Sequence, residues 1–516
     1  MSITRRSFLG KVAAGAACAA AAKTRAAATA PPPAKPPTEV DRRAHQYKYR
    51  VAFNCWMNDV RCEPLPLQNW PAPQLDDETM RSLLRAMDVQ SAAGLEYLDS
   101  WGYFATTGYP PDIVSTFKNP DRRQKVQAVL QAAKDRGMKH VFGLGTYSWG
   151  YEEIIKRDPS VAGRNVDGSI STCVLCDADP RSFDYIKKIL DCALSEYDFA
   201  GVHLESCDLG CCRCPKCAGK NDVVGYNVRI NMKTADYIRG NWPDKLVYVI
   251  PINWIPWGHF DEGQKTQLIE LSKHIDCFMD QGWLGTFIAP SERPGFIKSL
   301  HCAYGTSGGL WLYPSVRWDR ASYFLPYTER NGAAIKRHFD EGARACMLYQ
   351  GPMSNAGTEV NVAVAGRILA DTRRSVEDAL AEVIDLYYKP RSTAVQKRLV
   401  DIFQRAEEAY FGQWEPKAIT AHYGPPGAAV PRQLVCGDSH CPGEFKLDDL
   451  WGDSPGPALY LKPPHLSEAG RKAYAKGLIS ILKDLPEVEG KADDHGRIAN
   501  IKRSIIVTLT MVNSIG

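Results

Sequence analysis

Short apolar runs alternate with longer segments of helical periodicity between residues 49 and 350. A short apolar run predicts a strand, whereas apolar residues three and four positions apart predict an amphipathic helix. Strands are expected at residues 49–55, 95–101, 140–147, 199–205, 246–253, 275–281, 309–315 and 345–350. Helices are expected between them, for example at residues 78–87, 122–136, 182–194, 226–239, 262–273 and 327–341. This alternation predicts an α/β protein whose eight parallel strands close into a (β/α)8 TIM barrel.

The alternative fold is a doubly wound open sheet. It is disfavoured because no Gly-x-Gly-x-x-Gly turn follows the first predicted strand. After residue 360 the pattern is helical, at residues 362–388, 394–410, 467–482 and 498–512, with a Pro/Gly-rich insert at 414–464. We therefore expect a (β/α)8 barrel at residues 48–360 and a C-terminal, mainly helical region at residues 361–516.

The first 30 residues have the pattern of a twin-arginine signal peptide. Arg5 and Arg6 precede an apolar run at residues 12–22, and small residues follow that offer cleavage sites. The run has about half the length that a stable membrane-spanning helix needs. Residues 31–47 then form a Pro-rich linker. We expect export to the periplasm or the exterior without a stable membrane span, the alternative being a cytosolic chain with a basic arm.

Composition and charge narrow the range of partners. Hydrophobic residues make up 44% and charged residues 24% of the chain, as in ordinary soluble globular proteins. Removal of residues 1–30, which carry five basic residues and no acid, would change the net charge from +4 to −1. A nearly neutral chain gives no electrostatic reason to expect a nucleic-acid partner. No oligomeric state is predicted.

Aromatic and polar residues gather at the predicted strand ends, where barrels of this class place their active sites. Six of the eight ends carry a tryptophan. Aromatic faces stack on the C–H faces of a sugar, while carboxylates and amides bond its hydroxyls; the alternative is that each Trp packs a loop against the barrel. The substrate-binding candidates are Trp56, Asp99, Trp101, Tyr147, Trp149, Asp208, Asn253, Trp254, Trp283, Tyr313 and Arg317. Arg317 suggests a uronic or sulfated sugar, because guanidinium groups pair well with carboxylate and sulfate; the alternative is a surface ion pair.

Cleavage of a glycosidic bond requires two carboxyl groups, one protonated and one ionised. Glu205 ends the fourth predicted strand and is the acid candidate, although a buried ion pair is an alternative role. His203 shares its face of the strand and is expected to orient it. Asp280, at the end of the sixth predicted strand, is the candidate base or nucleophile, with Asp99 and Asp208 in reserve.

A cluster of cysteines follows Glu205. Cys212-x-Cys214-x-x-Cys217 supplies three thiols, and Cys173-x-x-Cys176 in the preceding loop offers a fourth. Four thiolates at this spacing suit a structural Zn²⁺. Disulfide pairing is the alternative in an exported protein. Catalysis itself is expected to need no cofactor, since four cysteines would leave no open position on the metal.

At residues 143–149, 199–205 and 366–371 the chain resembles (β/α)8 glycoside hydrolases of the α-glucuronidase and β-N-acetylhexosaminidase type. That resemblance implies that Glu205 is the proton donor. The cysteine run is similar to that of zinc-bearing barrel β-galactosidases, which implies a structural zinc. Two positions depart from these patterns: Leu204 stands where the hexosaminidases have Asp, and the seventh predicted strand has no Glu.

The sequence therefore predicts an exported hydrolase of O-glycosidic bonds in a polysaccharide or oligosaccharide. Two alternatives stay open. One is a carbohydrate-binding protein on a degenerate barrel without catalysis. The other is a metal-dependent hydrolase with a catalytic ion near His203.

Overall fold

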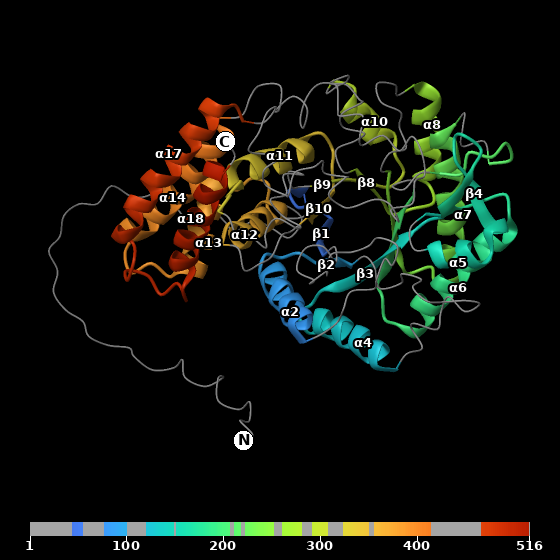
Figure 1. Cartoon of the computed structure of the whole chain (residues 1–516), viewed down its shortest axis with the longest axis horizontal. Helices are drawn as coiled ribbons and strands as arrows, with labels where there is room; N and C mark the ends of the chain where they lie inside the picture. The colour runs from blue at the N-terminus through green and yellow to red at the C-terminus, as the bar shows by residue number, and fades with distance from the viewer. Residues whose placement is uncertain are drawn as a thin grey trace, which may run out of the picture.

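Eight parallel strands close into a barrel at the centre of the molecule (Figure 1). The computed structural model describes residues 44–54, 77–100, 120–148, 151–206, 211–217, 222–251, 261–280, 291–307, 324–349, 356–413 and 466–514. Around the barrel the strand order is β1-β10-β9-β8-β7-β6-β3-β2. The strands are β1 (Tyr49–Asn54), β2 (Tyr97–Ser100), β3 (Lys139–Gly145), β6 (Gly201–Glu205), β7 (Leu246–Ile250), β8 (Cys277–Asp280), β9 (Ala303–Ser307) and β10 (Ala345–Tyr349). The predicted (β/α)8 barrel is confirmed.

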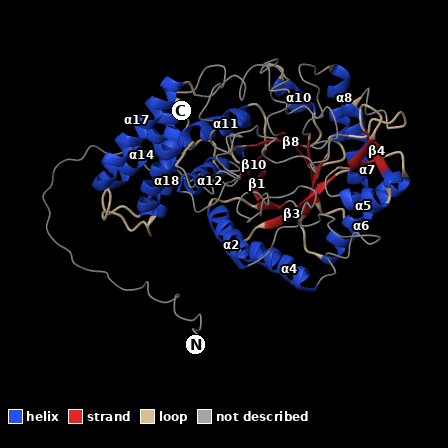
Figure 2. Cartoon of the chain, viewed as in Figure 1, coloured by secondary structure: helices blue, strands red, loops and turns tan. Residues whose placement is uncertain are grey.

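Helices surround the strands on the outside (Figure 2). They are α2 (Asp77–Ala92), α4 (Pro120–Asp135), α5 (Glu152–Arg157), α6 (Pro180–Glu196), α7 (Val223–Asn241), α8 (Glu262–Leu271), α10 (Arg293–Ser299), α11 (Thr328–Asp340) and α12 (Ala356–Ala370). Several begin at a capping side chain: Asp179 accepts from the N–H of Arg181 at α6, and Asp261 forms a capping box with Gln264 at α8. Such caps satisfy N–H groups that lack a partner within the helix.

The seventh barrel strand lies earlier in the chain than predicted. The run at residues 309–315 is richer in strand-forming aliphatic and aromatic residues, but β9 is formed by Ala303–Ser307, which pairs with β8 and β10. Gly305 explains why this segment fits. A Cβ there would lie 2.6 Å from Sδ of Met279 and 2.8 Å from Cβ of Ala345, so only glycine allows the three strands to approach. Residues 308–323 lie outside the described part of the chain.

The C-terminal helices pack against one side of the barrel beside α11 and α12 (Figure 1). They are α13 (Val376–Tyr388), α14 (Thr393–Phe411), α17 (Glu468–Asp484) and α18 (Arg497–Ser514), with the 3-10 turn η6 (Leu485–Glu487). The predicted helix at 362–388 is in fact two, α12 and α13. Since α12 follows β10 and contacts α2, it is a barrel helix, and the predicted boundary at residue 360 falls inside it.

Two buried carboxylates join this region to the barrel. Glu407 of α14 accepts the backbone N–H groups of Glu329 and Arg330 at the start of α11, at 3.0 and 2.9 Å. Glu359 of α12 pairs with Arg497 of α18 at 2.7 Å. Each carboxylate is buried and has hydrogen-bond donors, as burial of a polar group requires. The C-terminal helices are therefore fastened to the barrel wall.

An antiparallel hairpin, β4 (Ala162–Arg164) and β5 (Ile170–Leu175), extends the loop after β3 and was not predicted. The predicted signal at 1–30, most of the linker at 31–47 and the insert at 414–464 lie outside the described residues. Tyr47, placed in the linker by the sequence, is buried, and its hydroxyl donates to the Ile335 carbonyl at 2.6 Å. Within the described ranges, no helix combines the length and apolarity needed to cross a bilayer.

Candidate active site

Two side chains of β6 point into the barrel at the end of the strand. Alternate residues of a strand share a face, so His203 and Glu205 lie on the same side. The ring of Tyr248 on neighbouring β7 stacks on the imidazole, with centroids 5.1 Å apart and planes at 17°. Phe53 of β1 lies 6.0 Å from the same imidazole. Because β1 and β6 are not neighbours in the barrel, this contact crosses the interior, and His203 therefore faces the barrel axis.

Asp99 completes a chain of three side chains. Its Oδ2 atom lies 2.9 Å from Nδ1 of His203, and Oε2 of Glu205 lies 3.3 Å from Nε2. The Tyr248 hydroxyl donates a hydrogen bond to the same oxygen of Asp99. Asp99 and His203 are fully buried, whereas Glu205 retains 7% exposure. The order is therefore Asp99–His203–Glu205, and Glu205 is the last residue of its strand, at the end where barrel enzymes act.

A glycine makes this chain possible. Strand β3 lies between β2, which carries Asp99, and β6, which carries His203. Gly143 of β3 is in register with His203 and so shares the interior face. Its neighbour Phe142 faces outward, with its ring 5.0 Å from that of Phe199. Because position 143 has no side chain, the imidazole can reach across β3 to Asp99.

The two carboxylates hold a proton on His203. Burial by itself lowers the pKa of the imidazole, because a charge is poorly solvated there. The negative charges of Asp99 and Glu205, and their hydrogen bonds to the ring, outweigh that effect and raise the pKa from 6.5 to about 9. At neutral pH the ring is therefore a buried imidazolium between two carboxyl groups.

This shift predicts a pH-dependent stability. The folded-state pKa of His203 lies above the unfolded value, so its contribution is complete below pH 6.5, falls as pH rises, and is lost above about pH 9. The contribution is about 3 kcal/mol, from 1.36 kcal/mol per pKa unit. We expect the wild-type chain to lose more unfolding free energy between pH 6 and pH 10 than His203→Gln does, by about this amount. Equal losses of unfolding free energy in the two chains, measured by urea or thermal unfolding, would contradict the raised pKa of His203.

Strand β8 turns Asp280 away from this site. Tyr248, which faces the interior, is in register with Cys277, so by alternation Asp280 faces the surrounding helices. Its Oδ2 atom accepts a hydrogen bond of 2.5 Å from the Tyr304 hydroxyl of β9. Tyr304 in turn lies within electrostatic range of Arg293 on α10. The structure therefore does not bring Asp280 to the acid candidate, although both residues end barrel strands.

Tyr147 lies in the wall beside the barrel mouth. It is buried, it has a left-handed backbone conformation (φ 63°), and its hydroxyl accepts a hydrogen bond of 3.2 Å from Lys233 of α7. Lys233 also lies 3.3 Å from Asp177. Tyr147, which the sequence predicts to bind substrate, therefore joins the loop after β3 to α7. The other candidates lie outside the described residues: Trp56, Trp101, Trp149, Asp208, Asn253, Trp254, Trp283, Tyr313 and Arg317.

Four of the five predicted metal-ligating cysteines come together. The Sγ atoms of Cys176, Cys212, Cys214 and Cys217 all lie within 4.8 Å of one another. Hydrogen bonds among these thiols lower the pKa of Cys176 and raise the pKa values of Cys212 and Cys217, because the group accommodates one negative charge more readily than several. Cys173, the fifth, is buried in β5 and is not part of the group. The fourth thiol predicted from the Cys-x-x-Cys pair is thus Cys176.

Tyr248 is the residue of the site that sequence reasoning missed. It lies in the middle of the apolar strand Leu246–Ile250. The available signal was its hydroxyl group, because a buried Tyr hydroxyl usually has a hydrogen-bond partner. Here that partner is Asp99 of β2, three strands away around the barrel.

Comparison with known proteins shows similarity of fold but not of sequence. No protein-family model matches the chain, and no curated protein matches it. A solved GH138 enzyme targeting pectin rhamnogalacturonan II has a TM-score of 0.54 and 11% identity, over 91% of this chain and 57% of that one. A mutant of the Thermobaculum terrenum O-GlcNAc hydrolase has a TM-score of 0.44 and 11% identity, over 91% and 85%. The chain thus spans just over half the length of the GH138 enzyme and shares its fold, so the expected likeness to glycoside hydrolases is confirmed at the level of fold.

Proposed function

We propose that this chain is a glycoside hydrolase that cleaves O-glycosidic bonds at the mouth of its barrel, with Glu205 as the proton donor. The observation that carries the proposal is the chain Asp99–His203–Glu205, which ends in a slightly exposed carboxyl at the C-terminal end of β6. The fold shared with a GH138 enzyme supports it. Fold alone does not establish a reaction, so the assignment depends on the side chains.

The arrangement supplies what proton donation requires. When Glu205 gives its proton to the leaving oxygen, a negative charge forms on a buried carboxylate. With Glu205 protonated before the transfer, Asp99 is the carboxylate that keeps His203 charged; after the transfer the imidazolium, 3.3 Å from Glu205, compensates the charge that has formed there. A preorganised partner of opposite charge is worth far more inside a buried site than in water. His203 and Asp99 are therefore positioning residues in this proposal.

Both ring nitrogens of His203 face carboxylate oxygens. The ring thus bridges two acids in this arrangement, which fits a proton-transfer role better than ligation of a catalytic ion. The alternative of a metal-dependent hydrolase is tested by measuring activity after a chelator has removed the metal. Activity that survives complete removal of metal would exclude that alternative.

The second carboxyl group is proposed to be Asp208 rather than Asp280. Asp208 follows Glu205 by three residues, whereas the Asp280 carboxylate faces the helices and is bonded to Tyr304. Asp280→Asn is expected to keep kcat within about tenfold of wild type, and Asp208→Asn to lower it at least a hundredfold. Both variants are measured on one substrate. A larger loss of kcat in Asp280→Asn than in Asp208→Asn would instead identify Asp280 as the second carboxyl group.

The substrate is proposed to be an anionic polysaccharide or oligosaccharide, uronic or sulfated. Arg317 follows β9 in the sequence, and the affinity of a guanidinium group for carboxylate and sulfate supports this choice. The tryptophans at the strand ends are proposed to stack on the sugar. Because the GH138 enzyme targets a pectin, pectin fragments belong among the first substrates to test. Export by the twin-arginine route would bring the chain to such polymers outside the cytoplasm.

The test is release of sugar from a panel of aryl glycosides and neutral, uronic and sulfated polysaccharides. Cleavage of a uronic or sulfated member supports the full proposal. Cleavage of neutral members alone supports hydrolysis but overturns the anionic specificity. Binding without cleavage of any member would instead support the non-catalytic carbohydrate-binding protein.

A further inference from the structure

Four sulfur atoms form a compact group between two segments at the mouth of the barrel. Cys176 follows β5, whereas Cys212, Cys214 and Cys217 follow β6. Sγ of Cys176 lies 3.6 Å from that of Cys217 and 3.8 Å from that of Cys214. A disulfide would bring two sulfurs to about 2.05 Å. The ten cysteines in the described residues form no disulfide.

The separations of 3.6 and 3.8 Å match those of sulfurs at tetrahedral positions around a metal ion. Zn²⁺ binds cysteine sulfur at about 2.3 Å, so four sulfurs at tetrahedral positions lie about 3.8 Å apart. We infer that Cys176, Cys212, Cys214 and Cys217 bind one Zn²⁺ in a closed, structural site. An all-thiolate set selects soft ions such as Zn²⁺ over Mg²⁺ or Ca²⁺. Four protein ligands leave no position for substrate.

The backbone around Cys212 supports a metal-binding role. The N–H of Arg164 in β4 points at Sγ of Cys212, at 3.4 Å, and the N–H of Arg213 donates to the Arg164 carbonyl at 2.7 Å. Gly163 permits this close approach, because a Cβ there would lie 3.1 Å from Cβ of Cys212. N–H groups directed at ligand atoms orient them and stabilise their negative charge.

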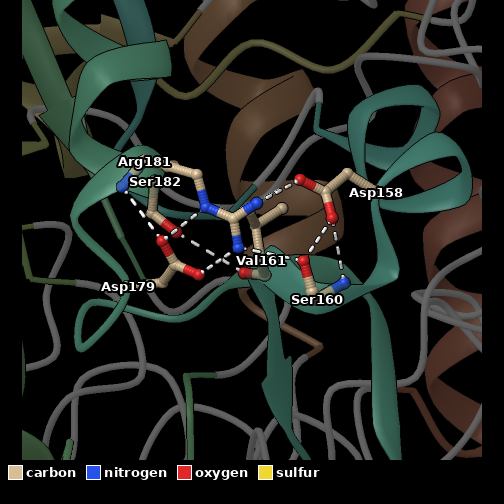
Figure 3. Close-up of polar contacts among 6 residues, drawn as sticks. All are labelled: Asp158, Ser160, Val161, Asp179, Arg181 and Ser182. Carbon is tan, nitrogen blue, oxygen red and sulfur yellow. Dashed lines mark hydrogen bonds and ion pairs between the residues drawn. The ribbon is translucent and has the colours of Figure 1, made fainter.

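Cys176 is held in place by a separate frame of hydrogen bonds. Its N–H donates to the Val161 carbonyl at 2.8 Å, and its carbonyl accepts from the N–H of Asp179 at 3.1 Å. Figure 3 shows the Arg181 guanidinium between Asp158 and Asp179, at 2.8 and 2.6 Å, which joins the segment before β4 to the start of α6. These hydrogen bonds position Cys176 without help from a metal ion. The loop after β6 supplies the other three ligands.

The site would fasten together two segments that border the active site. The hairpin β4–β5 is joined to the end of β3, since Ser148 bridges Val174 and the N–H of Leu175 donates to the Tyr147 carbonyl at 2.8 Å. The three other cysteines belong to the loop that begins just after Glu205. The inference goes beyond the proposed function, because metal binding can be measured whether or not the chain cleaves a sugar.

The test measures metal content of the purified full chain by mass spectrometry. We expect one zinc per chain, retained through dialysis. Cys214→Ser is expected to lower zinc at least tenfold. Cys173→Ser is the matched control, because Cys173 lies in the same hairpin but outside the group, and it is expected to keep the metal. Zinc in equal amounts in both variants would overturn the assignment.

A second readout uses Co²⁺ in place of zinc in the wild-type chain. Tetrahedral thiolate ligation gives intense visible and near-ultraviolet absorption that octahedral Co²⁺ lacks. This measurement decides the matter if Cys214→Ser fails to fold. A reduced wild-type chain that takes up neither ion, or an intact mass showing these four cysteines oxidised in the native protein, would overturn the inference.

Discussion

Replacing Glu205 with Gln is expected to lower kcat by about 10³-fold while substrate binding persists. General-acid catalysis contributes 10² to 10⁴-fold, and Gln has nearly the same shape as Glu but no transferable acidic proton. Glu205 is the one member of the Asp99–His203–Glu205 chain with any exposure, and it ends its strand at the barrel mouth. The measurement is kcat and KM on the best substrate of the panel.

Glu96→Gln serves as a control for this substitution. Glu96 precedes β2 and pairs with Arg50, away from the His203 network. It is expected to change kcat by no more than a factor of two. Wild-type turnover by Glu205→Gln would show that Glu205 is structural, and the proton donor would then have to be sought elsewhere at the barrel mouth.

Asp99→Asn is expected to lower kcat by about 10²-fold or more, with KM within a few-fold of wild type. Asp99 touches neither substrate nor solvent in this account; it acts by keeping His203 protonated and oriented at 2.9 Å. An Asn side chain is neutral, so burial of the imidazole is no longer offset by this charge and the His203 pKa falls. Glu205 then loses the positive charge that compensates its carboxylate.

The pH profile separates this positioning role from a merely structural one. The wild-type imidazole stays protonated up to about pH 9, whereas that of Asp99→Asn loses its proton at lower pH. The ratio of wild-type to variant kcat/KM should therefore rise between pH 6 and pH 9. A ratio independent of pH would indicate that Asp99 contributes only to folding.

Strands with strong apolar runs were predicted from the sequence, and a weak one was not. β1, β6, β7 and β10 lie within or at the predicted ranges, because burial on both faces of a barrel strand gives continuous apolar runs. β9 has the sequence Ala-Tyr-Gly-Thr-Ser, which has little local strand preference. Its place is decided by contact with Met279 and Ala345, which no local pattern reveals.

The same limit applies to the site. Period-two alternation was enough to place His203 and Glu205 on one face, because both belong to one strand. It was not enough to relate Glu205 to Asp280, because that relation depends on the register across β7 and β8. The contact of Asp99 with His203 spans the intervening strand β3, where Gly143 has no side chain. Cysteine spacing predicted a four-thiol group, but only the hairpin geometry distinguished Cys176 from Cys173.

The most direct test of the central claim is the dependence of cleavage rate on the leaving group, in wild type and in Glu205→Ala. Aryl glycosides whose phenols differ in pKa need different amounts of acid assistance. If Glu205 is the proton donor, the variant should lose little rate on the most acidic phenol and progressively more as the phenol pKa rises. A loss of the same size for every leaving group would contradict the assignment.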